Sequence, residues 1–185
     1  LWMAGVASAT NSLDNMDGAT GGTAAIASAT VFYIAWGQSA ESAQAWLSYV
    51  SIALLGASLG FLRYNYPCPS ARVFLGDNGS LLVGYILAAM LVLGGWAVHP
   101  IKAIVIPCVI LTVPLYDITL STVLRYKNRV VNTWGEGVVY CGRDHLSHRL
   151  IALGLSKVQA LWCLYGLGIA SGCLAVLLWK STSAV

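Results

Sequence analysis

Three short polar segments hold most of the residues that could carry out chemistry in this chain. The first covers residues 11–18, with the sequence Asn-Ser-Leu-Asp-Asn-Met-Asp-Gly, and lies between two apolar stretches. Its carboxylate and amide oxygens, from Asn11, Asp14 and Asp17, are hard ligands of the kind that Mg²⁺ accepts. The same residue types are common in helix caps and turns, so this segment taken alone also fits a purely structural role.

The second segment, residues 73–80, reads Val-Phe-Leu-Gly-Asp-Asn-Gly-Ser and leads into another apolar stretch. Glycines allow the backbone to approach a ligand closely, and the N-terminus of a helix offers unpaired N–H groups and a positive dipole to phosphate oxygens. Asp77 is then placed to hold a metal ion against that phosphate. Helix capping by Asp77 is the competing interpretation.

The third segment, residues 142–150, reads Gly-Arg-Asp-His-Leu-Ser-His-Arg-Leu. Its histidines, His145 and His148, are three residues apart, so we expect them on one face of a helix, flanked by arginines suited to pyrophosphate. A rival interpretation makes the two histidines zinc ligands together with Cys141. The positive charge of the flanking arginines argues against zinc.

Apolar stretches predict the elements that position these segments. The chain is 58% hydrophobic and 9% charged, far from the roughly 25% charged residues of a soluble domain. A bilayer core about 30 Å thick needs around 20 apolar residues in a helix. Five runs have that length: Ala19 to Gly37, Ala45 to Leu62, Ser80 to Val98, Ile101 to Leu124 and Val158 to Trp179.

A sixth run, Leu1 to Leu13, is too short to span a bilayer. The predicted fold class is therefore all-α: a polytopic transmembrane helical bundle with five full spans and one truncated N-terminal span. The start in the middle of an apolar helix indicates that residues 1–185 are a single membrane domain and a fragment of a larger multi-span protein. The five cysteines show no Cys-x-x-Cys spacing, so no disulfide framework is expected.

The charges divide unequally between the two sides of such a bundle. If the spans alternate, residues 14–18, 63–79 and 125–157 share one side. Of the ten basic residues, all but Lys102 and Lys180 lie there, which identifies that side as the cytoplasm. Most of the acids lie there as well, which favours chemistry on a soluble substrate and a lipid headgroup. The alternative is an ion-coupled transporter, for which Asp117 in a helix broken by Pro114 is the best feature.

Taken together, the segments resemble the polyprenyl-phosphate N-acetylhexosamine-1-phosphate transferases, over almost the whole chain. The Asn-x-x-Asp-x-x-Asp-Gly and Arg-x-Phe-x-Gly-Asp-x-Gly-Ser signatures of this family are similar to residues 11–18 and 72–80. Its histidine loop is similar to residues 145–150, and its Pro-x-x-Asp to Pro114 and Asp117. Ser8 and Ser147 stand where many members have Asn and His, and the paired-aspartate motif of the family would precede Leu1. The fragment alone is therefore expected to be inactive.

The resemblance implies transfer of a sugar 1-phosphate from a UDP-sugar to polyprenyl (undecaprenyl) phosphate, with release of UMP. This reaction would be the first membrane step of cell-envelope polysaccharide synthesis. The His-Arg-Leu form of the loop is more similar to the N-acetylglucosamine group than to the muramoyl-pentapeptide group. The cofactor implied is Mg²⁺, with Mn²⁺ as an alternative. Phosphoryl transfer asks the protein mainly to position groups and offset charge, which suits carboxylates and arginines around a cation.

Roles for individual residues follow from the same resemblance. The catalytic residues would be Asp14, Asp17, Asp77, His145 and His148. The substrate-binding residues would be Asn11, Asp17, Arg72, Arg143 and Arg149. The metal ligands would be Asn11 and Asp77. Asp117 has no role assigned by the resemblance; an intramembrane acid is a functional candidate, and pairing with Arg125 on the same helical face is the alternative.

The partners implied are the UDP-sugar, the polyprenyl phosphate and the lipid bilayer, without nucleic acid, and a homodimer is left open. The expected location is the bacterial inner membrane, with the active site on its cytoplasmic face. A catalytically inactive remnant is the remaining alternative to the enzyme and the transporter.

Overall fold

The computed structural model describes residues 1–38, 44–67, 70–97, 100–140, 142 and 144–183 of the chain. These residues form helices and connecting loops without a strand, which confirms the all-α fold class. The helices are α1 (Trp2–Leu13), α2 (Ala19–Gln38), α3 (Ala45–Asn65), α4 (Gly76–Leu93), α5 (Pro100–Ile110), α6 (Thr112–Lys127), α7 (Trp134–Val139), α8 (Leu146–Ala152) and α9 (Lys157–Ser183).

Among the described residues, three helices are long and apolar enough to cross a membrane: α3, α4 and α9. The consecutive helices α5 and α6 make a fourth candidate if they count as one broken span. The predicted five full spans are therefore not confirmed. The difference lies in α2, which has the expected position and 20 residues but carries Gly, Ser and Thr at several positions. Neighbouring helices bury most of its length.

The run from Ile101 to Leu124 was expected to be one continuous span, and the structure does not confirm this. It divides into α5 and α6, which are bent by 80° relative to each other. Pro114 has no backbone N–H to donate to the carbonyl of Ile110, and its ring crowds that carbonyl. The helix consequently breaks at Leu111, whose φ of −93° and ψ of 21° depart from helical values.

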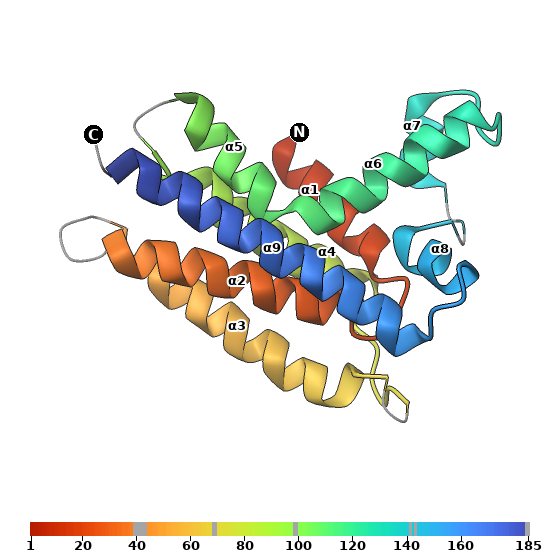
Figure 1. Cartoon of the computed structure of the whole chain (residues 1–185), viewed down its shortest axis with the longest axis horizontal. Coiled ribbons are helices and arrows are strands. Elements are labelled where there is room, and N and C mark those ends of the chain that lie inside the picture. The colour runs from red at the N-terminus through yellow and green to blue at the C-terminus, as the bar shows by residue number, and fades with distance from the viewer. Residues whose placement is uncertain (39–43, 68–69, 98–99, 141, 143, 184–185) are drawn as a thin grey trace.

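Small residues let the helices approach closely. Helix α1 packs along α4, and α2 packs between α3 and α9 (Figure 1). At Gly84 of α4, an added Cβ would lie 2.8 Å from the Cα of Ala7 and the Cβ of Thr10 on α1. Such contacts between backbones at small residues are typical of helix packing in membranes.

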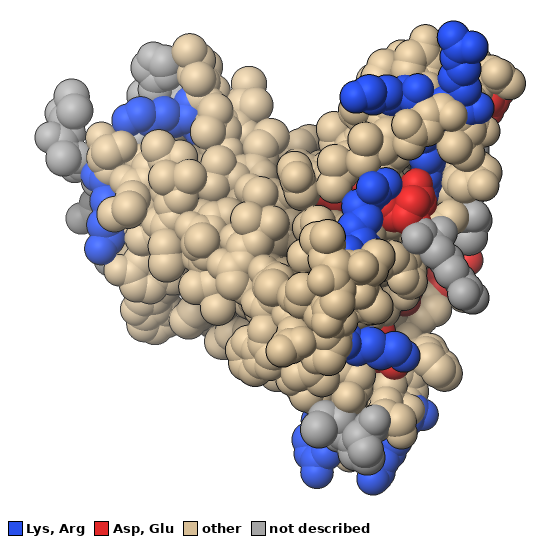
Figure 2. All heavy atoms as spheres, turned by 45° about the vertical axis from the view of Figure 1, so that its right-hand side comes forward, with Lys and Arg blue, Asp and Glu red and all other residues tan. Residues whose placement is uncertain are grey.

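The polar loops gather at one end of the bundle. The connections from α1 to α2, from α3 to α4 and from α6 to α9 all lie at the right-hand end in Figure 1, away from the C-terminus. In Figure 2 the acidic side chains in view lie over this end, between Lys and Arg side chains. The three polar segments thus share one end, as expected for alternating spans.

Candidate functional site

A cavity of about 410 Å³ opens at this end, where the α1–α2 loop, the α3–α4 loop and α8 meet. We call it the acidic cavity. Residues from all three polar segments line it: Asp14, Asn15, Met16 and Asp17 from the first, Phe74 and Leu75 from the second, and His148 from the third. Asn65, Ile151 and Lys157 complete the lining. The structure therefore brings together three segments that are far apart in the sequence.

Gly18 anchors the first polar loop to two other elements. Its backbone N–H donates to Asn65 Oδ1 at 2.7 Å, and Asn65 Nδ2 donates to the Val73 carbonyl at 2.8 Å. The Tyr165 hydroxyl of α9 donates to the Gly18 carbonyl at 2.7 Å. Gly18 has a φ of +82°, and an added Cβ would lie 2.9 Å from Cδ2 of Leu161. Only glycine suits both this backbone conformation and the available space.

Two hydroxyl–amide hydrogen bonds join the polar segments directly. The Ser80 hydroxyl donates to Asn11 Oδ1, which ties the start of α4 to the end of α1. The Ser147 hydroxyl of α8 donates to Asn15 Oδ1 of the first loop. Asn11, predicted as a metal ligand, thus already uses one lone pair of its side-chain oxygen within the protein.

The electrostatics of the acidic cavity favour a positively charged ligand. The pKa of Asp14 is raised to about 6, chiefly by burial and also by the charges of Asp77 and Asp17, while hydrogen bonds from the Thr20 hydroxyl and the Gly76 backbone oppose the rise. Within the described residues, no Lys or Arg forms an ion pair with Asp14, Asp17 or Asp77.

Asp77 lies beside Asp14 rather than in the cavity lining. It is exposed in the first turn of α4, directly after Gly76, whose φ is +67°. The described residues contain no group of three His, Cys, Asp or Glu side chains arranged to hold a metal ion alone. The site nevertheless suits Mg²⁺, which uses one or two carboxylates and takes its remaining oxygens from water and substrate phosphates. The clustering of Asp14, Asp17 and Asp77, whose charges raise the pKa of Asp14, is the observation that supports this fit.

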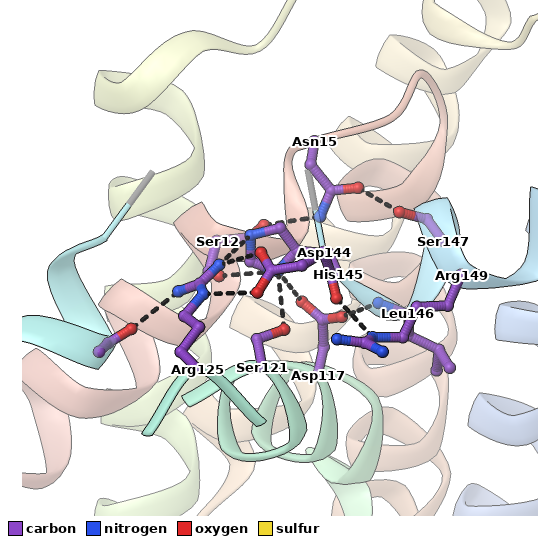
Figure 3. Close-up of polar contacts among 11 residues, drawn as sticks. Ser12, Asn15, Asp117, Ser121, Arg125, Asp144, His145, Leu146, Ser147 and Arg149 are labelled. Atoms are coloured by element: carbon purple, nitrogen blue, oxygen red, sulfur yellow. Dashed lines mark hydrogen bonds and ion pairs between the residues drawn. The ribbon is translucent and has the colours of Figure 1, made fainter. Parts of the chain in front are cut away.

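A second set of charged residues lies beside the start of α8, between α6 and the third polar segment (Figure 3). We call Asp117, Arg125, Asp144 and His145 the α6–α8 cluster. Arg125 Nε and Nη2 donate to Asp144 Oδ2 and Oδ1 at 2.7 and 2.5 Å, and Nη1 donates to the Gly137 carbonyl at 2.7 Å. The hydrogen bond from Arg125 holds the pKa of Asp144 below its ordinary value.

His145 connects the remaining members of this cluster. Its Nδ1 lies 2.8 Å from Asp117 Oδ2, and its Nε2 lies 3.3 Å from Arg125 Nη2. These contacts fit a neutral imidazole that donates from Nδ1 to the carboxylate and accepts at Nε2 from the guanidinium. Asp117 therefore pairs with His145, whereas Arg125 pairs with Asp144. The expected alternative of an Asp117–Arg125 pair does not occur.

The two histidines do not share a helical face, contrary to expectation. Helix α8 begins at Leu146, so His145 is its N-cap and has an extended backbone, with a ψ of 161°. Its ring is buried against α6, whereas His148 lies within α8 and lines the acidic cavity. Both ring nitrogens of His145 are engaged, which leaves none for zinc, and Cys141 lies outside the described residues.

The arginines predicted to bind substrate have different positions. Arg149 Nε donates to the Asp144 carbonyl at 2.6 Å, so it holds the loop before α8. Arg72 is exposed in the α3–α4 loop, and it is absent from the described lining of the acidic cavity. Arg143 lies outside the described residues.

Sequence reasoning assigned no role to several residues of the site. Phe74 was noted only as part of a signature, and Lys157 only as one basic residue among eight. Asn65 and Tyr165 were not singled out. Asn65 could have been noticed as an amide at the polar end of an apolar helix, but the contact of Tyr165 with Gly18 joins residues 147 positions apart and leaves no local pattern.

Comparison with known proteins agrees with these features. Residues 1–95 match the family described as glycosyl transferase family 4. The chain is 30% identical over 182 residues to a probable undecaprenyl-phosphate N-acetylglucosaminyl 1-phosphate transferase of Bacillus subtilis, covering 98% of this chain and 48% of that protein. It is 34% identical over 169 residues to a phospho-N-acetylmuramoyl-pentapeptide-transferase of Synechococcus sp., covering 89% and 44%.

A third relative is a decaprenyl-phosphate N-acetylglucosaminephosphotransferase of Mycobacterium tuberculosis, 27% identical over 175 residues, which cover 86% of this chain and 41% of that protein. The chain thus spans less than half the length of each of these three relatives.

Proposed function

The chain belongs to glycosyl transferase family 4, and from this premise we propose that it forms part of a membrane enzyme that transfers N-acetylhexosamine 1-phosphate from a UDP-sugar to polyprenyl phosphate, with release of UMP. The observation that carries the proposal is the acidic cavity, where Asp14, Asp17 and His148 converge from separate polar segments beside Asp77. A transporter is less well supported, because Asp117 is closed off by His145 instead of lining a path across the bundle.

A divalent cation, Mg²⁺ or Mn²⁺, would lie among the carboxylates of this cavity. Asp77 and Asp14 are the ligands we propose, with Asn11 nearby at the junction of α1 and α4. When bound, the cation would offset negative charge on the diphosphate. Asp17 would contact the nucleoside or order the cation site.

Two basic residues of the cavity lining come from α8 and the start of α9. They are His148 and Lys157, which would contact the diphosphate or the sugar. Phe74 is 81% exposed in the α3–α4 loop at the mouth of the cavity, where its ring could stack on a base.

N-acetylglucosamine is the donor sugar that we favour. The names of the Bacillus and Mycobacterium relatives both contain this sugar, and the histidine loop resembles their group. The excess of Lys and Arg at the cavity end supports a cytoplasmic position for that end by the positive-inside bias. In the bacterial inner membrane, the reaction would begin the synthesis of a cell-envelope polysaccharide.

The experiment that tests the proposal measures UMP release by membranes that contain the whole protein, supplied with polyprenyl phosphate and either UDP-N-acetylglucosamine or another UDP-N-acetylhexosamine. We expect release that stops with EDTA and resumes with Mg²⁺ or Mn²⁺. Asp77→Asn should reduce the rate about 100-fold, a typical cost of losing one charge-stabilising group.

Glu136→Gln is the matched control. Its carboxylate is also exposed, but it belongs to the capping box of α7, which glutamine can maintain. Absence of UMP release with every donor, or equal rates for Asp77→Asn and Glu136→Gln, would exclude the proposed reaction at this site.

A further inference from the structure

Helix α6 carries a buried polar stripe that the proposed function does not use. Asp117, Ser121 and Arg125 are four residues apart, so they lie on one face of the helix. Their exposed fractions are 0%, 0% and 2%. All three side chains contact the ring of one residue, His145, and the Ser121 hydroxyl lies 3.4 Å from its Nδ1 (Figure 3). An ionisable group inside an apolar helix is costly, so a stripe of this kind requires an explanation.

Asp117 binds both the residue before α8 and the first residue of α8. Its Oδ1 accepts the backbone N–H of Leu146 at 2.6 Å, and its Oδ2 accepts from His145 Nδ1 at 2.8 Å. The first N–H groups of a helix have no partner within that helix. His145 occupies the N-cap position without a capping bond from its own side chain. The Asp117 carboxylate of α6 therefore caps the N-terminus of α8 in place of the His145 side chain.

The other surfaces of α8 face the acidic cavity. Ser147 donates to Asn15 in the first polar loop, and His148 and Ile151 line the cavity. Helix α8 has only seven residues, too few to be stable without such contacts. Leu146, Leu150 and Ile151 also pack against the apolar cluster that includes Leu161 and Leu164 of α9. Asp117 and Asn15 add polar contacts that fix the N-terminal turn of α8, and with it the position of His148.

We propose that Asp117 is a positioning residue for the acidic cavity: it orients α8 through Leu146 and His145, and so holds His148 toward the carboxylates. Asp117 acts without touching substrate. The effect on turnover rests on the proposed function, whereas the effect on α8 itself depends only on the geometry described above.

Hydrogen–deuterium exchange of the whole protein tests the geometric part. In Asp117→Leu, which removes both acceptors, we expect exchange at residues 146–152 to accelerate about tenfold, because local opening becomes easier, while α1 and α4 keep their protection. Asp117→Asn keeps an oxygen for the Leu146 N–H and should restore most of the protection. Tyr116→Phe, on an exposed neighbour in α6, should match the wild type.

Turnover supplies the second measurement. We expect Asp117→Leu to reduce the rate of UMP release about 100-fold, since a displacement of about 1 Å has a cost of this order, and Asp117→Asn to recover to within about tenfold of the wild type. Unchanged exchange in α8 of Asp117→Leu would overturn the inference. A loss of exchange protection throughout the chain, equal in Asp117→Leu and Asp117→Asn, would also overturn it. That result would mean that Asp117 contributes to folding in general and not to the position of α8.

Two further outcomes are distinguishable. If the wild type releases no UMP, the proposed function fails, and the exchange data alone decide whether Asp117 positions α8. If Asp117→Leu does not fold, Asp117→Asn and Asp117→Glu carry the test. The longer Glu displaces the acceptor, so α8 should lose protection with Glu and keep it with Asn. Equal exchange in these two variants would contradict the inference.

Discussion

The acidic cavity and the α6–α8 cluster both contact the same short helix, α8, but their charged groups have different partners. In the cluster, Arg125 meets Asp144 through two hydrogen bonds, and Asp117 meets His145. In the cavity, burial and neighbouring carboxylates raise the pKa of Asp14 to about 6. The cluster satisfies its charges internally and holds α8 in place, whereas the cavity leaves negative charge available to a ligand. Ionisable groups alone therefore do not identify a binding site; their partners do.

The largest effect on stability should come from Arg125→Met. This change leaves Asp144 without its guanidinium partner and Asp117 and His145 without a neighbouring cation, in a site where Arg125 is 2% exposed. Breaking a buried pair by removing one partner typically costs about 3–5 kcal/mol. Thermal unfolding in detergent should show the loss. Arg129→Met, an exposed position in the same region, is the control, and an equal shift in both variants would break the comparison.

Asp17→Asn should impair turnover without lowering stability, in contrast to Arg125→Met. Because Asp17 lines the cavity and is not part of the cluster, we expect the rate of UMP release to fall about 100-fold, or roughly 2.7 kcal/mol, with little change in the unfolding temperature. Rates and melting curves from one preparation check this. A variant that melts early but turns over normally would place Asp17 in the structural network instead.

Asp14 and Asp144 should give opposite pH dependence. A carboxyl whose folded pKa is raised stabilises the fold fully below its unfolded pKa of about 3.9, and this stabilisation is lost as pH rises through about 6. Asp14→Asn should therefore raise the unfolding temperature at pH 7.5 by roughly 2–4 °C, with a smaller gain at pH 4.5.

Asp144 is the matched comparison, because Arg125 lowers its pKa. The stability that it contributes is present above its unfolded pKa and is lost as pH falls through its folded pKa. Asp144→Asn should consequently lower the unfolding temperature at pH 7.5. Shifts of the same sign in both variants at pH 7.5 would contradict the assignment of the two environments.

The smallest effect should come from Lys157→Met at the rim of the acidic cavity. Removing this exposed ammonium should raise the KM for the UDP-sugar about fivefold, or about 1 kcal/mol, without a change in stability. Lys180→Met, near the other end of α9, serves as its control. Identical KM values for the two variants would remove Lys157 from the site.

The sequence predicted the parts of this molecule that depend on local patterns. Apolar runs gave the starts of α2 at Ala19 and α3 at Ala45, and the alternation of runs placed the three polar segments at one end. Both features follow from side-chain hydrophobicity and the rise of a helix, which are properties of short stretches of chain. The segments with Asp14 and His148 therefore meet as the sequence analysis anticipated.

The remaining features depend on contacts between distant residues. His145 and His148 have helical spacing, but the helix starts one residue too late to include His145, because Asp117 of α6 captures its ring and the next N–H. Likewise, Asn65 and Tyr165 enter the site only because Gly18 bonds to both. Patterns within one segment contain no information on which partner another helix will supply.

The bend between α5 and α6 affects how a lipid could reach the cavity end. Helix α5 has 11 residues, about 16 Å at 1.5 Å per residue, or roughly half of a bilayer core. If α5 lies along the bilayer normal, a turn of 80° directs α6 nearly parallel to the membrane plane. Under the proposed function, a long-chain lipid substrate would then reach the cavity end by lateral diffusion within the leaflet, and its hydrocarbon tail would stay in the membrane.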